Sequence, residues 1–376
     1  MPQDQTAPDR RARNALLAVG IASFVLMGAG QALFGPALPT YERLLAITTA
    51  QAAWIVSAFW VGSFLGVAAM YFNGTKVTPR TGLAGLAVGA VLLAKGGTWL
   101  PVVAGSVLFG AGYGVLTALF NPRVLAVFGL RGPSMLSLLN ATFSIGAIAA
   151  PQVFIALGGD PKLVFGLLAV LAAVLAAVLW LATGLTGRVK VVAAAQSGGF
   201  RLSWPILIFG AFAIGMEASL VGLGPTALVR AGLSEESAAN LLSLFFVAFL
   251  AGRIALVFLA LLVPSFAIYT GAVALAALCS FGVAMGSAAW FFPPMGLATG
   301  LFFPGFFVTA TARMGADARV GPVIIGMGLV GAILSPLIYA QLIGVLGPRG
   351  FFWLIGGVAG TLTLAALAMF QSMMRV

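Results

Sequence analysis

One carboxyl group stands apart from the other acidic residues of this sequence. Glu217 lies inside a long apolar stretch, about thirteen residues from either end, which is roughly 20 Å from each end of a helix. If that helix crosses a bilayer, an ionised acid at this depth costs about 3 kcal/mol or more, and burial favours its protonated form. We therefore expect Glu217 to face a cavity and carry a proton or bind substrate, the alternative being a protonated acid bonded to a neighbouring helix. The other acids fall in expected tails or loops: Asp4, Asp9, Glu42, Asp160, Glu235, Glu236 and Asp317.

Uncharged polar side chains within other apolar stretches form a second group. Amides and hydroxyls both donate and accept hydrogen bonds without the cost of a buried charge, so they suit a neutral hydroxylated substrate. An indole could stack on the apolar face of a sugar ring. The predicted substrate-binding set is Gln31, Trp60, Tyr113, Asn121, Asn140 and Glu217.

The remaining chemistry is sparse. The sequence has no histidine and one cysteine, Cys279, so the usual zinc ligand and the commonest general base are missing. There is also no phosphate-binding glycine loop with its lysine, which argues against ATP as the energy source. We expect no catalytic residues, no metal and no cofactor, and we do not expect an enzyme. A single carboxylate as the coupling group fits a proton better than Na⁺, which usually takes several oxygen ligands.

The elements that position these residues are long apolar segments. Of the 376 residues, 61% are hydrophobic and 7% are charged, whereas soluble domains are about a quarter charged. A helix needs about 20 apolar residues to cross the hydrocarbon core. Twelve such spans are predicted, at 15–37, 50–72, 80–97, 101–121, 133–157, 162–184, 204–229, 237–262, 264–284, 287–311, 321–346 and 349–371.

The basic residues predict the orientation of these spans, because cytoplasmic loops carry the excess of lysine and arginine. With the N-terminus inside, fourteen basic residues fall on the inner side and five outside, the outer ones being Arg43, Lys95, Lys162, Arg230 and Arg349. The net charge of +11 is thus explained by topology, and no nucleic-acid partner is expected. We expect a multi-pass protein of a bacterial-type plasma (inner) membrane, with both termini cytoplasmic and the lipid bilayer as its surroundings. No oligomer signal is present, so a monomer is expected.

An internal repeat divides the chain into halves. Gly146–Pro151 matches Gly331–Pro336, Gly35-Pro36 matches Gly224-Pro225, Gly66 matches Gly252 and Pro122 matches Pro304, at offsets of 182 to 189 residues. The shared order favours duplication over chance. The predicted organisation is a cytoplasmic tail at 1–14, a six-helix bundle at 15–185, a cytoplasmic linker at 186–203, a second six-helix bundle at 204–371 and a cytoplasmic end at 372–376.

Two six-helix halves, a basic loop at 73–82 and a central linker resemble the transporters of the major facilitator superfamily over nearly the whole chain. The loop keeps the glycines and basic charge of the family signature but lacks its acid. Three short stretches, 139–147 with Pro151, 215–220 and Gly252-Arg253, resemble the branch of fucose and glucose proton symporters. That branch places acids in helices 1 and 4, where this chain has Gln31 and Asn121.

The resemblance implies an all-α membrane protein that works by alternating access, most simply as a proton-coupled symporter of a sugar or similar polar metabolite. A drug or metabolite exporter of the same fold is an alternative, and a non-transporting sensor or scaffold is an alternative of another class. Arg80, Arg123 and Arg253 lie near expected cytoplasmic helix ends, where they would contribute to a gate between the halves or extend toward the surface. A small-molecule substrate and protons are the expected partners.

Overall fold

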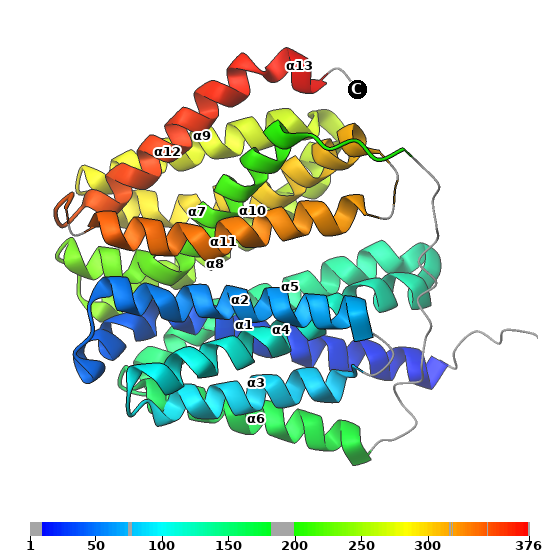
Figure 1. Cartoon of the computed structure of the whole chain (residues 1–376), viewed down its shortest axis with the longest axis vertical. Coiled ribbons are helices and arrows are strands. Elements are labelled where there is room, and N and C mark those ends of the chain that lie inside the picture. Colours follow the sequence, from blue (N-terminus) through cyan, green and yellow to red (C-terminus); the bar gives the residue numbers. More distant parts are fainter. Residues whose placement is uncertain are drawn as a thin grey trace, which may run out of the picture. The chain divides into compact units, whose positions relative to one another are not determined.

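The computed structural model describes residues 10–73, 77–181, 199–315, 317, 319–343 and 345–374. In this part of the chain the regular structure is helical (Figure 1). The helices are α1 Arg10–Leu45, α2 Thr49–Asn73, α3 Pro79–Lys95, α4 Trp99–Phe128, a 3₁₀ turn Gly129–Arg131, α5 Gly132–Ala156, α6 Pro161–Leu181, α7 Trp204–Arg230, α8 Glu235–Leu262, α9 Ser265–Ala284, α10 Ala288–Met314, α11 Val320–Ile343, α12 Gly350–Ala368 and α13 Phe370–Met374.

Eleven of these helices, within the described residues, are long and apolar enough to cross a membrane. The third expected span, 80–97, corresponds to α3, which has 17 residues and is therefore shorter than the roughly 20 residues of a typical span. Twelve crossings in two six-helix bundles stay a prediction.

Two helices continue well past their predicted ends. Pro36 and Pro39 lie inside α1, which runs to Leu45, and Pro122 lies inside α4, which runs to Phe128. Proline normally ends a helix in water, but within a membrane protein neighbouring helices compensate for the lost hydrogen bond. Glu42, expected in a loop, consequently lies within α1.

The described residues form two compact units, which do not coincide with the predicted bundles. Unit 1 comprises the described residues of 10–31, 61–147 and 162–181, and unit 2 those of 32–60, 148–161 and 199–374. The bundle boundaries predicted from the sequence stay a prediction.

In unit 1, α3 packs along α4, with α6 on its other side in Figure 1. In unit 2, α10 contacts α7, α8 and α9, while α11 lies on α7 and α12 on α9.

Glycines set the close helix contacts, and these contacts repeat along the chain. A Cβ on Gly66 of α2 would collide with the carbonyl oxygen of Ala111, and one on Gly252 of α8 would lie 2.7 Å from that of Leu297. Each residue of the second pair follows its counterpart by 186 positions. The same spacing relates two further glycine–carbonyl contacts, Gly114 with Ser63 on α4 and α2, and Gly300 with Phe249 on α10 and α8.

The first helix of each half follows nearly the same register. Gly146 of α5 meets the backbone of Val25, and Gly331 of α11 meets the backbone of Ala211, so α7 follows α1 by 186 positions. This corrects the alignment of Gly35-Pro36 with Gly224-Pro225, which is displaced by almost one turn. In the contact register the residue equivalent to Glu217 is Gln31.

Candidate functional site

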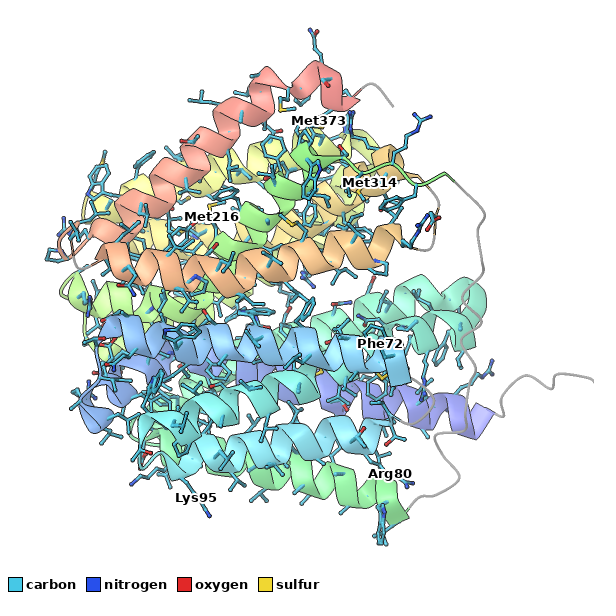
Figure 2. The ribbon with its side chains drawn as sticks, in the orientation of Figure 1. Phe72, Arg80, Lys95, Met216, Met314 and Met373 are labelled. Carbon is cyan, nitrogen blue, oxygen red and sulfur yellow. The ribbon has the colours of Figure 1, made fainter. Side chains whose placement is uncertain are left out.

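Glu217 lies at the centre of α7, thirteen residues after Trp204 and thirteen before Arg230, as predicted. Figure 2 marks the preceding residue, Met216, on this helix. The Glu217 side chain is partly exposed, while both of its chain neighbours are buried. Within unit 2 the described residues provide no hydrogen bond or ion pair to its carboxyl group.

The helix face that carries Glu217 is directed at α10. Gly210 and Gly224, seven residues to either side of Glu217, face the rings of Phe306 and Phe292. Aromatic rings of α10 therefore fill the space beside these two glycines, on either side of Glu217 along the helix. Because α7 and α10 run in opposite directions, Glu217 comes level with the middle of α10, at Thr299.

Thr299 is 1% exposed, and its hydroxyl donates to the carbonyl of Gly296, at 3.0 Å. On either side of it, Gly296 and Gly300 bring α10 against the carbonyls of Phe245 and Phe249 in α8. Glycine at both positions is what allows α8 to approach α10 this closely. Along the helix axes, Glu217 of α7 therefore lies near the same height as this close contact between α8 and α10.

Arg253 enters the same region from α8. It lies nine residues before Leu262, about 13 Å from the helix end, which is also the end of the predicted span, and its gate function stays a prediction. Its guanidinium carbon stands 4.5 Å from the centre of the Phe249 ring. We call Glu217, Arg253 and Thr299 the charged site.

The predicted substrate-binding residues of unit 1 include two buried oxygen atoms without a partner among the described residues, the Gln31 Oε1 and the Asn121 Oδ1. Gln31 is 7% exposed. Buried amide oxygens are nearly always hydrogen-bonded to protein or water, so both atoms are suited to accept from a ligand or a water molecule.

The other predicted binding residues have local partners. Tyr113 meets Phe143 edge to face, with ring centres 6.3 Å apart. The amide nitrogen of Asn140 donates to the carbonyl of Leu136, at 2.9 Å. Trp60, in unit 2, meets Phe59 edge to face, with ring centres 4.9 Å apart. The set is thus divided between the units, and its common role in one site stays a prediction.

The predicted gate residues differ in their surroundings. Arg80 donates to the carbonyl of Leu179 from its Nε, at 3.1 Å, and from its Nη2, at 2.8 Å. It thereby holds the last turn of α6 to the start of α3, where Figure 2 shows it. Arg123 is partly exposed on α4, directly after Pro122. The structure thus gives Arg80 a clear packing function, while the gate itself stays a prediction.

The Arg230 end of α7 contacts segments of the early helices within unit 2. Arg43 of α1 forms an ion pair with Glu235, and Arg230 donates to Thr49 of α2. Gly35 of α1 meets the carbonyl of Val221 on α7. Arg43 and Arg230, both predicted on the outer side, thus lie at the same end of this unit.

A second polar contact at this end joins α5 to α8. The amide nitrogen of Gln152 donates to the Asn240 Oδ1, at 2.9 Å, and to the Ser243 Oγ, at 3.0 Å. Ser243 in turn donates to the carbonyl of Ile148, at 3.0 Å. Early and late helices are therefore joined at this end by polar side chains as well as by close packing.

The position of Thr299 opposite Glu217 and the equivalence of Gln31 with Glu217 in the repeat were not predicted from the sequence. A signal for both was present in the glycines at positions 66 and 252 and at 114 and 300. A single offset of 186 residues aligns these pairs and would also have aligned Gln31 with Glu217 and Tyr113 with Thr299.

No protein-family model and no curated protein matches this chain. Solved structures do match over nearly its full length. A POT family transporter in complex with 5-aminolevulinic acid has a TM-score of 0.75 at 13% identity, covering 95% of this chain and 97% of the other. The nucleoside transporter NupG has a TM-score of 0.70 at 16% identity, covering 96% and 99%. The xylose transporter XylE from E. coli, in an inward-open, partly occluded conformation, has a TM-score of 0.70 at 12% identity, covering 96% and 99%.

These similarities, together with the eleven apolar helices, indicate an integral membrane protein. At such low identity they establish architecture and not substrate. They confirm, at the level of the fold, the resemblance noted in the sequence: the chain has the fold of the major facilitator superfamily transporters.

Proposed function

We propose that this chain is a secondary transporter that moves a small polar solute across the membrane by alternating access, coupled to protons through Glu217. The observation that carries the proposal is a partly exposed acidic residue, Glu217, at the centre of α7, at a depth where an ionised acid is costly and usually functional. The transporter fold supplies the setting in which such a group is used.

The repeat supports coupling through the second half of the chain. Gln31, which occupies the position equivalent to Glu217, cannot take up a proton in the physiological range. Its buried amide oxygen can still accept a hydrogen bond from a solute. We infer that α7 binds the proton and that Gln31, with Asn121, contributes neutral binding groups.

The proposed topology has twelve crossings in two six-helix bundles, with α3 as the short span and both termini in the cytoplasm of a bacterial-type cell. The grouping of Arg43 and Arg230 at one end of unit 2 supports this orientation. The gate function of Arg80, Arg123 and Arg253 and the roles of Trp60, Tyr113 and Asn140 belong to the same proposal, with a monomer as the working unit.

Proton-coupled transport is tested with purified protein in liposomes that contain a pH-sensitive dye. Xylose, uridine, 5-aminolevulinate and lactate are added outside in turn, and solute-driven proton entry is recorded. We expect at least one solute to acidify the lumen and Glu217→Gln to abolish that signal while the protein still binds the solute. Glu236→Gln, an exposed acid at the start of α8, is the matched control and should retain coupling. Full gradient-driven accumulation by Glu217→Gln would refute the coupling assignment.

A further inference from the structure

In unit 2, α1 and α7 each carry an arginine in the last turn that binds a helix of the other half of the chain. Arg43, two residues before the end of α1, donates from both Nη atoms to the carboxylate oxygens of Glu235, the first residue of α8. Arg230, the last residue of α7, donates to the hydroxyl of Thr49, the first residue of α2. The two contacts therefore cross: each arginine binds the start of the second helix in the other half.

The repeat relates these two contacts to each other. Glu235 follows Thr49 by 186 positions, which is the spacing of the glycine–carbonyl contacts, and Arg230 follows Arg43 by 187. The arginines thus occupy equivalent places at the ends of α1 and α7, and their partners begin equivalent helices. An interface between two similar bodies related by a two-fold axis contains such reciprocal contacts, in which one residue type meets another twice. The two contacts are therefore one arrangement formed in both directions.

We propose that these contacts form a crossed clasp that holds this end of unit 2 closed and must separate before a solute can pass at the outer surface. The clasp consists of Arg43, Glu235, Arg230 and Thr49. The proposal rests on the alternating-access function given above and identifies residues that control one of its two openings. The gate residues predicted from the sequence lie near the cytoplasmic helix ends and concern the other opening.

Close packing lies directly beneath the clasp. A Cβ on Gly35 of α1 would lie 2.4 Å from the carbonyl oxygen of Val221, and one on Gly222 of α7 would lie 2.6 Å from a methyl carbon of Val56 on α2. Val221 is nine residues before Arg230, about 13 Å along the helix. Because α7 touches α1 and α2 over this depth, a polar solute has no passage between these helices while the clasp is closed.

Hydrogen bonds extend the closure to α5. Arg43 also donates from its Nη2 to the hydroxyl of Thr40, at 3.3 Å, and this hydroxyl donates to the carbonyl of Gly159 after α5, at 3.4 Å. Gln152 of α5 donates in turn to Asn240 of α8, at 2.9 Å. The helices α1, α2 and α5 each place one end in unit 2, and each is joined there to α7 or α8. Separation of the clasp would therefore release three early helices from the late ones.

The exposure of the clasp suits a contact that must open. The Arg43 and Glu235 side chains are 60% and 34% exposed, so water can solvate both charges when they part. A buried ion pair would be far more costly to separate. An exposed pair shifts the equilibrium between closed and open states by about fivefold at most, equivalent to about 1 kcal/mol. The pair therefore favours the closed state without preventing opening.

The first experiment measures opening in detergent, without transport. Val56, which is 3% exposed and faces Gly222, is replaced by cysteine in a Cys279→Ser background. The rate at which this cysteine reacts with a bulky maleimide reports the separation of α2 from α7. Thermal melting of each protein confirms that it is folded.

The reporter is combined with changes to the ion pair. The variants are Glu235→Gln, Arg43→Glu, and the exchanged variant that carries both Arg43→Glu and Glu235→Arg. Glu236→Gln, which removes the exposed acid beside Glu235, is the matched control. All rates are measured at low and at high salt.

We expect Glu235→Gln to raise the labelling rate by up to about fivefold, and Arg43→Glu to raise it further because two acids then face each other. The exchanged variant should return toward the wild-type rate, and Glu236→Gln should react as wild type does. High salt should bring the rates of wild type and Arg43→Glu closer together, since it screens the attraction in one and the repulsion in the other.

The second experiment links the clasp to transport. Arg43→Cys and Glu235→Cys are combined in the Cys279→Ser background, joined by a short bifunctional maleimide and reconstituted in the dye-loaded liposomes described above. We expect the cross-linked protein to lose solute-driven proton entry with xylose, uridine, 5-aminolevulinate and lactate. Each single cysteine variant, treated with the same reagent, should retain it.

Equal labelling rates in wild type and Arg43→Glu would overturn the proposal, as would an exchanged variant that labels as fast as Arg43→Glu. Proton entry that persists in the cross-linked protein would also overturn it, while leaving proton-coupled transport intact. Conversely, labelling that follows the ion pair, with no solute-driven proton entry in any protein, would refute the proposed function and leave the clasp as the control of a conformational change.

Discussion

Gly300 provides the most direct test of the helix packing that frames the charged site. A Cβ at this position would lie 2.6 Å from the carbonyl oxygen of Phe249 on α8. Ordinary contacts are roughly 3.5 Å, so Gly300→Ala must separate the two backbones by about 1 Å. Overpacking of this kind costs about 1–3 kcal/mol, partly offset by the better helix propensity of alanine, about 1 kcal/mol.

Gly357→Ala on α12 isolates the contact, because a Cβ there meets no atom within 4 Å. This variant should gain up to about 1 kcal/mol from helix propensity alone. Reversible unfolding in mixed micelles with increasing dodecyl sulfate gives the free energy of unfolding of both proteins. We expect the two variants to differ by about 1–3 kcal/mol, with Gly300→Ala the less stable. Equal stabilities would refute the close contact between α8 and α10.

Three further predictions concern stability. Glu235→Ala removes an ion pair whose side chains are 34% and 60% exposed, so it should cost about 1 kcal/mol or less in the same unfolding assay, with a smaller cost at high salt. Tyr269→Phe removes a buried hydrogen bond to the carbonyl of Phe209, 2.9 Å long, and should cost about 1 kcal/mol while leaving proton coupling in liposomes unchanged. Hydrogen bonds from Arg319, first from its side chain and then from its backbone, lower the pKa of Asp317 to about 2. Because the unfolded value is near 4, the stabilisation is complete above about pH 4 and is lost as the pH falls through about 2. The difference in melting temperature between wild type and Asp317→Asn should follow that course.

Most of the fold could be predicted from the sequence because a bilayer imposes one simple requirement on helix length and polarity. The span at 204–229 agrees with α7 within a residue, and the span at 264–284 agrees equally well with α9. The errors lie at prolines. Pro36, Pro39 and Pro122 resembled helix ends, but packing against neighbouring helices lets the backbone continue through them.

The site was predictable only in part. The depth of Glu217 follows from counting residues in one helix, and the structure agrees. The aromatic rings that face its helix depend on how α7 packs against α10, which composition does not encode. Gly210 faces the ring of Phe306, a residue 96 positions away in the sequence that no local pattern connects to it.

The repeated glycine contacts have a consequence for how such a protein can diversify. The two halves have the same close glycine–carbonyl contacts, at positions 66 and 252 and at 114 and 300. The helix packing is therefore encoded once in each half. Glu217 and Arg253, in contrast, occur only in the second half, and the equivalent residues of the first half are Gln31 and Val67. A duplicated chain can in this way place an acid and an arginine in one copy and uncharged residues at the equivalent positions of the other, whereas an assembly of two identical subunits would carry both charges twice.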